Sequence, residues 1–204
     1  MNEYITVRHA GTYEYEDRKS RFIGQVQPVT TEEEALAHLQ IVKKTYPDAR
    51  HHVYAYLLRS GAVRFSDDHE PQGTAGVPIL DLLRKQEISD VCVVVTRYFG
   101  GTLLGTGGLV RAYTEAAAGA LRAAEVVTCA LYAVTDIRLT YPDYQKFAAV
   151  CTTLGFRTEN TEYADEVTVT GAIPAGEYDA FFATVTDMTG GRARVKKQKE
   201  IFST

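Results

Sequence analysis

The stretch RYFGGTLLGTGGLVR, residues 97–111, organises the first half of this chain. It follows a run of β-branched residues, 91–96, and it leads into an alanine-rich helical pattern over 112–124. We therefore predict a strand, a glycine-rich loop and the start of a helix. Five glycines within nine residues are costly in backbone entropy unless the loop needs a positive φ or a close approach by another group. Unpaired amide groups at the helix start would favour an anion.

Two interpretations of this glycine-rich loop stay open. In the first, Gly100 and Gly101 form a tight turn, while Gly107 and Gly108 let the helix pack closely on the sheet. In the second, the backbone cradles a phosphate or another anion, and Arg111 in the first helical turn adds a charge-assisted contact. The loop has neither the GxGxxG fingerprint of dinucleotide sites nor the GK[ST] ending of a Walker loop.

The composition is typical of a globular protein, with 45% hydrophobic and 24% charged residues in a chain of 204. The net charge of −4 excludes a global basic field, so any nucleic-acid contact must come from a local patch. Neither a membrane span nor a signal-peptide-like segment is present, and we expect a cytoplasmic protein with no membrane partner. Three well-separated cysteines are expected to be buried thiols: Cys92, Cys129 and Cys151.

Hydrophobic periodicity divides the chain into two α+β domains, 1–126 and 127–204. In the first, the pattern predicts a strand pair over 13–26, helices over 31–45 and 74–85, strands over 52–58 and 91–96, and the helix over 112–124. In the second it predicts strands over 131–140, 156–163, 166–173 and 193–202, with helices over 141–154 and 177–188. The βαββαβ order of this second domain predicts a ferredoxin-like fold.

The acidic stretch 67–73 is a second candidate site. Asp67, Asp68 and Glu70 place three carboxylates within four residues, which resembles a Mg²⁺ site. Such residues also serve as turn formers and helix caps. A further interpretation couples the two loops, with the carboxylates holding Arg97 or Arg111 in place.

The adjacent His51 and His52 would point to opposite faces of a strand, so they do not form a chelating pair. We predict no metal ligands, no cofactor and no catalytic residue. One of these histidines, with Tyr54 and Tyr56, forms an aromatic stripe that either stacks nucleic-acid bases or packs in the core.

Basic residues cluster in two further places. Lys19 and Arg21 share one face beside Phe22 and could contribute to a basic patch. The segment 192–199 holds five basic residues in eight. On an edge strand they would block edge-to-edge pairing, and the alternative is an electrostatic contact with nucleic acid.

Several long motifs resemble the IMPACT family, and the bacterial YigZ-like branch in particular. They are SDDHEPQGTAGVP at 66–78, VVTRYFGG at 94–101, LGTGGLVRAY at 104–113, KSRF at 19–22 and ARHH at 49–52. The resemblance is close over residues 12–125, and the remainder resembles the small C-terminal domain of bacterial members. His69 and Gln72 depart from the family pattern, which usually has a glycine and a small residue there.

The resemblance implies an N-terminal domain like domain 2 of ribosomal protein S5. It implies a ferredoxin-like C-terminal domain similar to a translation-elongation-factor module. Eukaryotic members regulate translation by binding a ribosome-associated activator of a stress kinase through an additional domain without counterpart here, so we do not expect that partner. Bacterial members are proposed to bind nucleic acid or ribosomes.

We therefore expect a non-enzymatic translation regulator that binds RNA, the ribosome or a translation factor. A phosphate- or nucleotide-dependent enzyme and a protein-interaction module remain alternatives. The predicted ligand-binding residues are Lys19, Arg21, His51, His52, Asp67, Asp68, Glu70, Thr74, Arg97, Tyr98, Gly100, Gly101, Gly105, Gly107, Gly108 and Arg111. A groove around the glycine-rich loop is expected from Lys19, Arg21, His52, Arg97, Tyr98 and Arg111.

Overall fold

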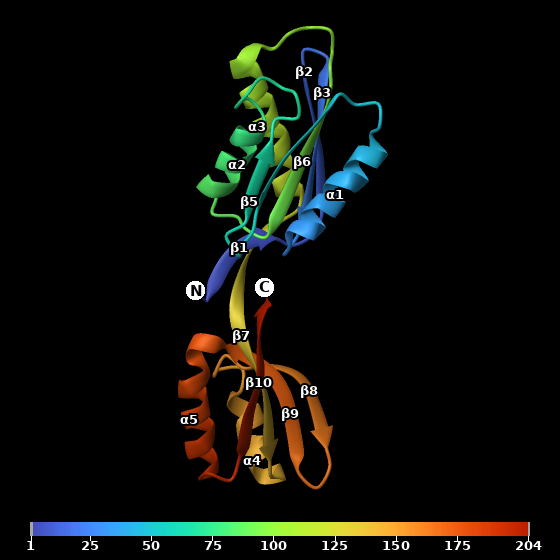
Figure 1. The fold of residues 1–204 in the computed structure, drawn as a ribbon. Helices are drawn as coiled ribbons and strands as arrows, with labels where there is room; N and C mark the ends of the chain where they lie inside the picture. Colours follow the sequence, from blue (N-terminus) through green and yellow to red (C-terminus); the bar gives the residue numbers. More distant parts are fainter. Residues whose placement is uncertain (1, 204) are drawn as a thin grey trace. The chain divides into compact units, whose positions relative to one another are not determined.

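A computed structural model describes residues 2–203 (Figure 1). The chain forms two compact units. Among the described residues, the N-terminal unit comprises 4–128, and the C-terminal unit comprises 129–203 together with 2–3. Each unit has its own hydrophobic core.

The N-terminal unit is built on an antiparallel sheet with the strand order β2-β3-β6-β4-β5. The central strand β6 (Val91–Tyr98) is buried on both faces up to Arg97, which matches its unbroken apolar sequence. The other strands of this sheet are β2 (Gly11–Asp17), β3 (Ser20–Pro28), β4 (His51–Leu57) and β5 (Val63–Ser66). The strand β1 (Glu3–Val7) pairs instead with β7 (Val126–Leu139) in the second sheet.

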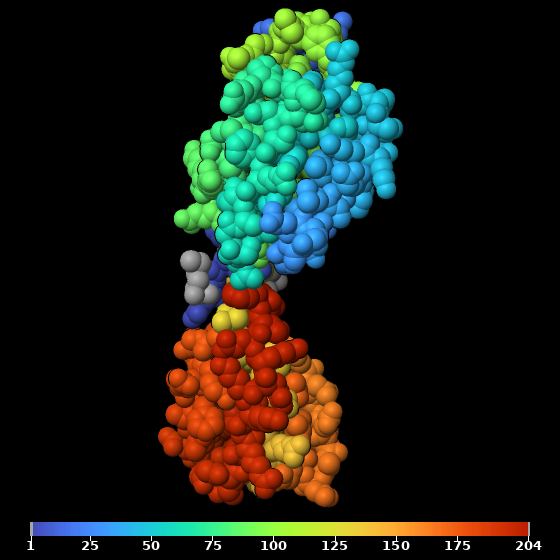
Figure 2. All heavy atoms as spheres, in the orientation of Figure 1, coloured from blue at the N-terminus to red at the C-terminus, as the bar shows by residue number. Residues whose placement is uncertain are grey.

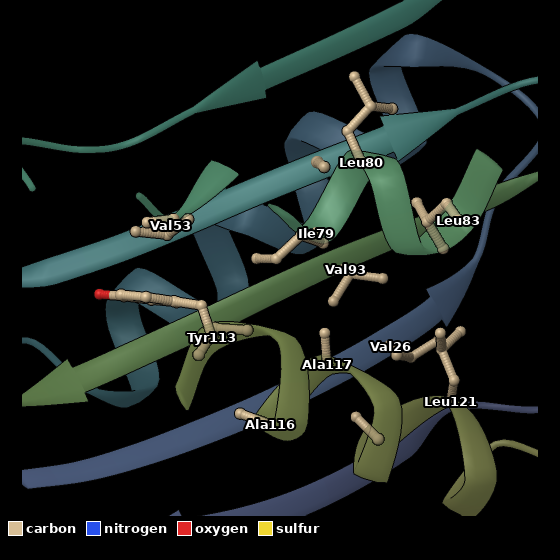
Figure 3. Close-up of a cluster of buried hydrophobic side chains, with 14 of the residues drawn as sticks. Val26, Val53, Ile79, Leu80, Leu83, Val93, Tyr113, Ala116, Ala117 and Leu121 are labelled. Atoms are coloured by element: carbon tan, nitrogen blue, oxygen red, sulfur yellow. The ribbon is translucent and has the colours of Figure 1, made fainter. Parts of the chain in front are cut away.

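Helices cover both faces of this sheet (Figure 1). On one face lies α1 (Glu32–Thr45), which packs through Ala35, Leu39 and Val42. On the other face lie α2 (Gly76–Lys85) and α3 (Gly105–Ala123). Figure 3 shows this second, larger core, where side chains from both helices meet the β-branched residues of the strands.

Local sequence signals explain how these helices begin and pack. The predicted capping box opens α1, because the Thr31 side chain accepts from the Glu34 amide and the Glu34 carboxylate accepts from the Thr31 amide. Close packing of α3 on the sheet depends on Gly24, where a Cβ would lie 2.3 Å from the Ala116 carbonyl oxygen. At this point of the core, glycine is a requirement of helix–sheet packing.

The C-terminal unit has the order β7, α4, β8, β9, α5, β10, with a 3₁₀ turn η1 (Ala175–Glu177) before α5. In its sheet β7 lies between β10 and β9, and β8 follows β9. Phe147 of α4 and Phe181 of α5 fill the core on one face of the sheet. The bounds are β7 (Val126–Leu139), α4 (Tyr141–Val150), β8 (Arg157–Tyr163), β9 (Val167–Pro174), α5 (Tyr178–Thr189) and β10 (Arg194–Ser203).

The two-domain α+β fold and the βαββαβ order are confirmed. Three details differ from the sequence prediction. The charged N-terminus contains β1, and the short β5 follows β4 as an edge strand. The third helix begins at Gly105 and not near residue 112, so it includes the seven residues 105–111 that precede the predicted helix. Glycine has a low helix propensity, so the prediction excluded these residues from the helix. Tertiary packing overrides that propensity here.

An ion pair ties the start of α4 to the segment before β10, and it makes the C-terminal unit sensitive to acid. Arg192 donates to both carboxylate oxygens of Asp143 at 2.9 and 2.7 Å, and the Thr140 hydroxyl donates to the same carboxylate. These hydrogen bonds, with the Arg192 bond as the largest cause, lower the pKa of Asp143 to about 2.

Because this folded-state pKa is below the usual value near 4, the stabilisation is complete at neutral pH. It is lost as the pH falls from about 4 through 2. We expect the hydrogen-exchange protection of the α4 amides, relative to their intrinsic rate at each pH, to fall over that range in the full chain. In Arg192→Gln, this protection should already be low at neutral pH. Lys146→Gln is the control, since its ammonium lies 3.9 Å from the carboxylate and is exposed. An unchanged profile in Arg192→Gln would contradict this account.

Candidate functional site

One end of the N-terminal sheet gathers the segments that the sequence singled out. The register places Arg21 of β3 beside Tyr98 of β6, and His51 of β4 beside Arg97. The β2–β3 turn, the segment before β4, the acidic loop after β5 and the glycine-rich loop after β6 therefore meet at this end, shown at the top of Figure 1. We call it the glycine-loop end, comprising residues 18–21, 48–51, 67–74 and 97–111.

The first half of the glycine-rich loop is shaped by contact with the β2–β3 turn. A Cβ on Gly100 would lie 2.0–2.3 Å from backbone atoms of Lys19 and Ser20, so only glycine fits. The Ser20 hydroxyl accepts a hydrogen bond from the Gly100 amide at 3.1 Å. The architectural interpretation is therefore right for Gly100. The loop leaves two apolar side chains exposed, Phe99 at 45% and Leu103 at 82%.

The second half of the loop is the first turn of α3. Arg111 is thus in the second helical turn and not in the first as predicted, because the helix starts six residues before it. No side chain caps the helix start. Gly107 has no atom within 4 Å of the position of a Cβ, so packing does not explain its presence. An uncapped helix start with open space beside it has the features of an anion-binding turn.

The aspartates of the acidic loop organise backbone. The Asp67 carboxylate accepts from the amides of Gly73, Ala75 and Gly76, which orders the loop and the start of α2. The Asp68 carboxylate accepts from the His52 amide at 2.6 Å. These bonds favour the turn-forming interpretation over a Mg²⁺ site. Within residues 2–203, no three histidine, cysteine, aspartate or glutamate side chains are arranged to hold a metal ion.

The backbone of this loop is also strained. Asp68 and His69 have φ values of +42° and +69°, which lie in the left-handed region that favours glycine. This explains why His69 is an unexpected residue for the loop. Thr74 is buried, and its hydroxyl donates to the Pro71 carbonyl at 2.6 Å.

Beneath the glycine-rich loop lies a buried polar cluster centred on Glu70. One oxygen of its carboxylate accepts from Arg97 at 2.6 Å and from the Tyr113 hydroxyl at 2.8 Å. The imidazole of His51 lies 3.9 Å from the same oxygen, and its Nδ1 contacts the Asp68 carbonyl. Burial, followed by the Glu70 charge, raises the pKa of Tyr113, so this hydroxyl remains a hydrogen-bond donor. The interpretation that coupled the two loops is confirmed for Glu70 and Arg97.

Arg97 is held on its other sides by aromatic rings. Its guanidinium lies 5.3 Å from the ring centre of Phe22 and 5.7 Å from that of Phe99. Its Nε is buried and has no hydrogen-bond partner among residues 2–203. Because Arg97 is only 5% exposed, it supports the loop from below and is not available at an open surface as the predicted groove requires.

His52 is also removed from that groove. It is buried on the α1 face with its Nε2 3.1 Å from the Tyr46 carbonyl, and burial lowers its pKa. Tyr54 and Tyr56 stack on one another on the same face, where Tyr56 is fully buried and donates to Glu32 of α1. The aromatic stripe therefore belongs to the core, because α1 covers it.

The remaining predicted residues lie at or near the surface. Arg21 forms a two-pronged ion pair with Glu14, and the Tyr98 hydroxyl donates to Asp48 at 2.8 Å. Lys19 and Arg111 are exposed, and neither forms an ion pair among the described residues. Gly101 and Gly105 have positive φ values of +86° and +72°, with no atom near the place of a Cβ.

Sequence reasoning missed Tyr113 and Ser20 as parts of the site. Tyr113 lies in the alanine-rich helix pattern and was read as part of the helix only. A single tyrosine among alanines at a core-facing position indicates a buried hydroxyl that needs a hydrogen-bond partner, and this signal was available in the sequence. Ser20 lies in the interruption between two strands, where its role depends on a partner 80 residues away.

Comparisons with known proteins agree with this architecture. The Impact N-terminal domain matches residues 18–121, which include the whole glycine-loop end. The chain belongs to the IMPACT family. A domain of unknown function, DUF1949, matches residues 137–192 of the C-terminal unit.

Relatives within the IMPACT family come from bacteria and eukaryotes. The chain is 35% identical to the IMPACT family member YvyE of Bacillus subtilis over 97% of this chain and 92% of that protein. It is 36% identical to YigZ of Escherichia coli over 86% of this chain and 88% of that protein. Mouse protein IMPACT is 38% identical over 44% of this chain and 30% of its own length, so the similarity covers less than half of either chain.

A crystal structure described as that of a hypothetical protein covers 98% of both chains with a TM-score of 0.62 and 31% identity. The two-domain arrangement of elements is therefore found in an experimental structure as well. No helix within residues 2–203 has the length and apolar character needed to cross a bilayer.

Proposed function

We propose that this IMPACT family member is a non-enzymatic cytoplasmic protein that binds RNA of the translation machinery through its glycine-loop end. The observation that carries this proposal is the uncapped start of α3, where Gly107 is open to solvent. Two exposed cations accompany it, Arg111 in the second turn of the same helix and Lys19 in the β2–β3 turn. Free amide groups and the helix dipole favour a phosphate at such a turn.

The neighbouring side chains suit a single-stranded polynucleotide. Phe99 is 45% exposed and lies on the loop that leads into α3, where it can stack on a base. Base–aromatic stacking contributes about 1–3 kcal/mol and tolerates any sequence. The rigid support below, from Glu70, Arg97 and Tyr113, holds the loop in place before a ligand arrives.

The test is RNA binding by the full chain over a series of salt concentrations. Wild type should bind single-stranded RNA at low salt and lose affinity as salt rises, because phosphate contacts release counterions. In Lys19→Gln/Arg111→Gln, affinity should fall, and the salt slope should become shallower by about 1.4 for two lost contacts. Absence of binding at low salt would refute the proposal. Heat released with nucleotide and Mg²⁺ would instead favour the alternative of a phosphate-dependent enzyme.

Gly107→Ala separates an architectural role from a binding role. Alanine stabilises a helix position by about 0.5–1 kcal/mol relative to glycine, and nothing in the structure obstructs the new methyl group. We therefore expect a higher urea midpoint together with weaker RNA binding, since the methyl group narrows the approach to the helix start. Thr184→Ala, on the exposed face of α5, is the control that raises helix propensity away from the site. Unchanged binding in Gly107→Ala would count against this turn as the phosphate site.

A further inference from the structure

The sheet of the C-terminal unit has one face that its helices do not cover. Both α4 and α5 pack on the face that carries Ile137, Val169 and Ile173. In Figure 2 the atoms of β10, β7 and the β8–β9 hairpin lie side by side at the surface of this unit. We call this the open sheet face. Its exposed cations are Arg138, Arg157, Arg194, Lys196 and Lys199.

Four of the five cations on the open sheet face have no ion-pair partner among the described residues. Arg194 of β10 lies directly opposite Arg138 of β7, an arrangement of like charges that destabilises a sheet. Lys196 lies opposite Asp136, but that carboxylate accepts from Thr170 and from Gln198. None of Arg138, Arg194, Lys196 and Lys199 has an ion pair among the described residues. The face therefore carries four unpaired cations beside the carboxylates of Asp136 and Glu162, although the chain as a whole is acidic.

Protection of an edge strand explains only part of this pattern. Within the described chain β10 pairs with β7 alone, so its lysines would discourage pairing with another molecule. Arg138 does not fit this explanation, because β7 is an interior strand with partners on both sides. An arginine placed opposite another arginine, on an interior strand and pointing away from the helices, needs a different reason.

We propose that the open sheet face binds the phosphate backbone of RNA. Residues two apart on a strand are separated by about 7 Å, so β10 presents its cations in a row, and Arg138 and Arg157 widen the row across the sheet. A polynucleotide supplies one negative charge per nucleotide along such a row. The inference shares its partner class with the proposed function, but it rests on different residues in the other unit.

The chemistry of the face favours backbone contacts over base recognition. RNA recognition modules read bases with aromatic side chains on the face of a four-stranded sheet. Here the outward residues of β9 are Thr168 and Thr170, and Tyr132 of β7 is covered by the Arg157 guanidinium 4.6 Å from its ring centre. We therefore expect binding that is sensitive to salt and indifferent to sequence.

The deciding experiment compares two pairs of lysine substitutions in the full chain. Lys196→Gln/Lys199→Gln removes two charges from the open sheet face. Lys146→Gln/Lys197→Gln removes two charges from elsewhere in the same unit, where Lys146 lies on α4 and Lys197 pairs with Glu200. Binding to poly(U) and poly(A) of about 20 nucleotides is measured over a salt series. For the open-face variant we expect affinity to fall roughly tenfold at low salt and the slope to decrease by about 1.4.

Each outcome has a separate meaning. Equal loss of affinity for poly(U) and poly(A) in the open-face variant, with the control unchanged, supports the inference. Wild-type affinity and slope in that variant overturn it, as does binding to anionic phospholipid vesicles without binding to RNA. Absence of RNA binding by the wild-type chain would refute both ideas. Where the wild type binds, the proposed function is judged on Lys19→Gln/Arg111→Gln and Gly107→Ala, so either idea can fail while the other stands.

Discussion

Arg97→Met is expected to destabilise the N-terminal unit by about 3–5 kcal/mol, because it removes one partner of a buried ion pair. The side chains of Arg97 and Glu70 are only 7% and 4% exposed, and their charged atoms lie 2.6 Å apart. Without the guanidinium, the buried Glu70 carboxylate keeps only the Tyr113 hydroxyl as a close donor, with the His51 imidazole 3.9 Å away. The uncompensated charge, more than the lost bond, causes the destabilisation.

Urea unfolding of the full chain measures this effect, with hydrogen exchange of the α3 amides assigning it to the N-terminal unit. Glu70→Gln/Arg97→Met should lose less stability than Arg97→Met, since the buried charge is then absent. Arg111→Met is the control, because Arg111 is exposed on α3, and its change should stay within about 0.5 kcal/mol. If Arg97→Met unfolds at the wild-type urea concentration, the cluster is not a structural support.

The sequence predicted most of the fold because its elements carry local signals. The capping box at Thr31, the unbroken apolar run of β6 and the alternation of β4 each specify their own structure. The strands β1 and β5 were not predicted because each is set by a partner elsewhere in the chain, β7 for β1 and β4 for β5, and not by its own pattern. The start of α3 was predicted too late for a related reason. Its glycines have poor helix propensity, and tertiary packing overrides that propensity.

The candidate site was predicted as a set of segments and not as a geometry. The glycine-rich loop, the acidic loop and the 19–21 segment were identified from composition, and the structure brings them to one end of a sheet. The sequence pattern does not predict which side chains contact one another in the site. His52 and Arg97 are both polar residues in strands and were predicted to bind a ligand. In the structure both side chains are buried and form hydrogen bonds within the protein. Their roles depend on contacts between residues far apart in the chain, which local spacing does not encode.

Gly100→Ala is expected to destabilise the N-terminal unit by about 3 kcal/mol, at the upper end of overpacking effects. The new Cβ would lie 2.0 Å from the Lys19 carbonyl carbon and 2.3 Å from the Ser20 nitrogen. Both are backbone atoms of a turn whose residues Arg18 and Lys19 already have positive φ values of +47° and +65°. The turn backbone therefore cannot move far enough to make room for the methyl group. The glycine-rich loop must instead move away from β2 and β3.

Two matched variants identify the cause of this loss in the same urea experiment. Ser20→Ala removes only the hydrogen bond from the Gly100 amide, so its effect should be about 1 kcal/mol. Gly107→Ala adds the same methyl group in open space seven residues later, and it should raise stability. A ranking in which Gly100→Ala resembles Gly107→Ala would show that the loop does not rest on the β2–β3 turn. With the expected ranking, the loop has two functionally different halves. The first half, at Gly100, is fixed by contact with the sheet, and the second half, at Gly107, is open where a ligand would approach.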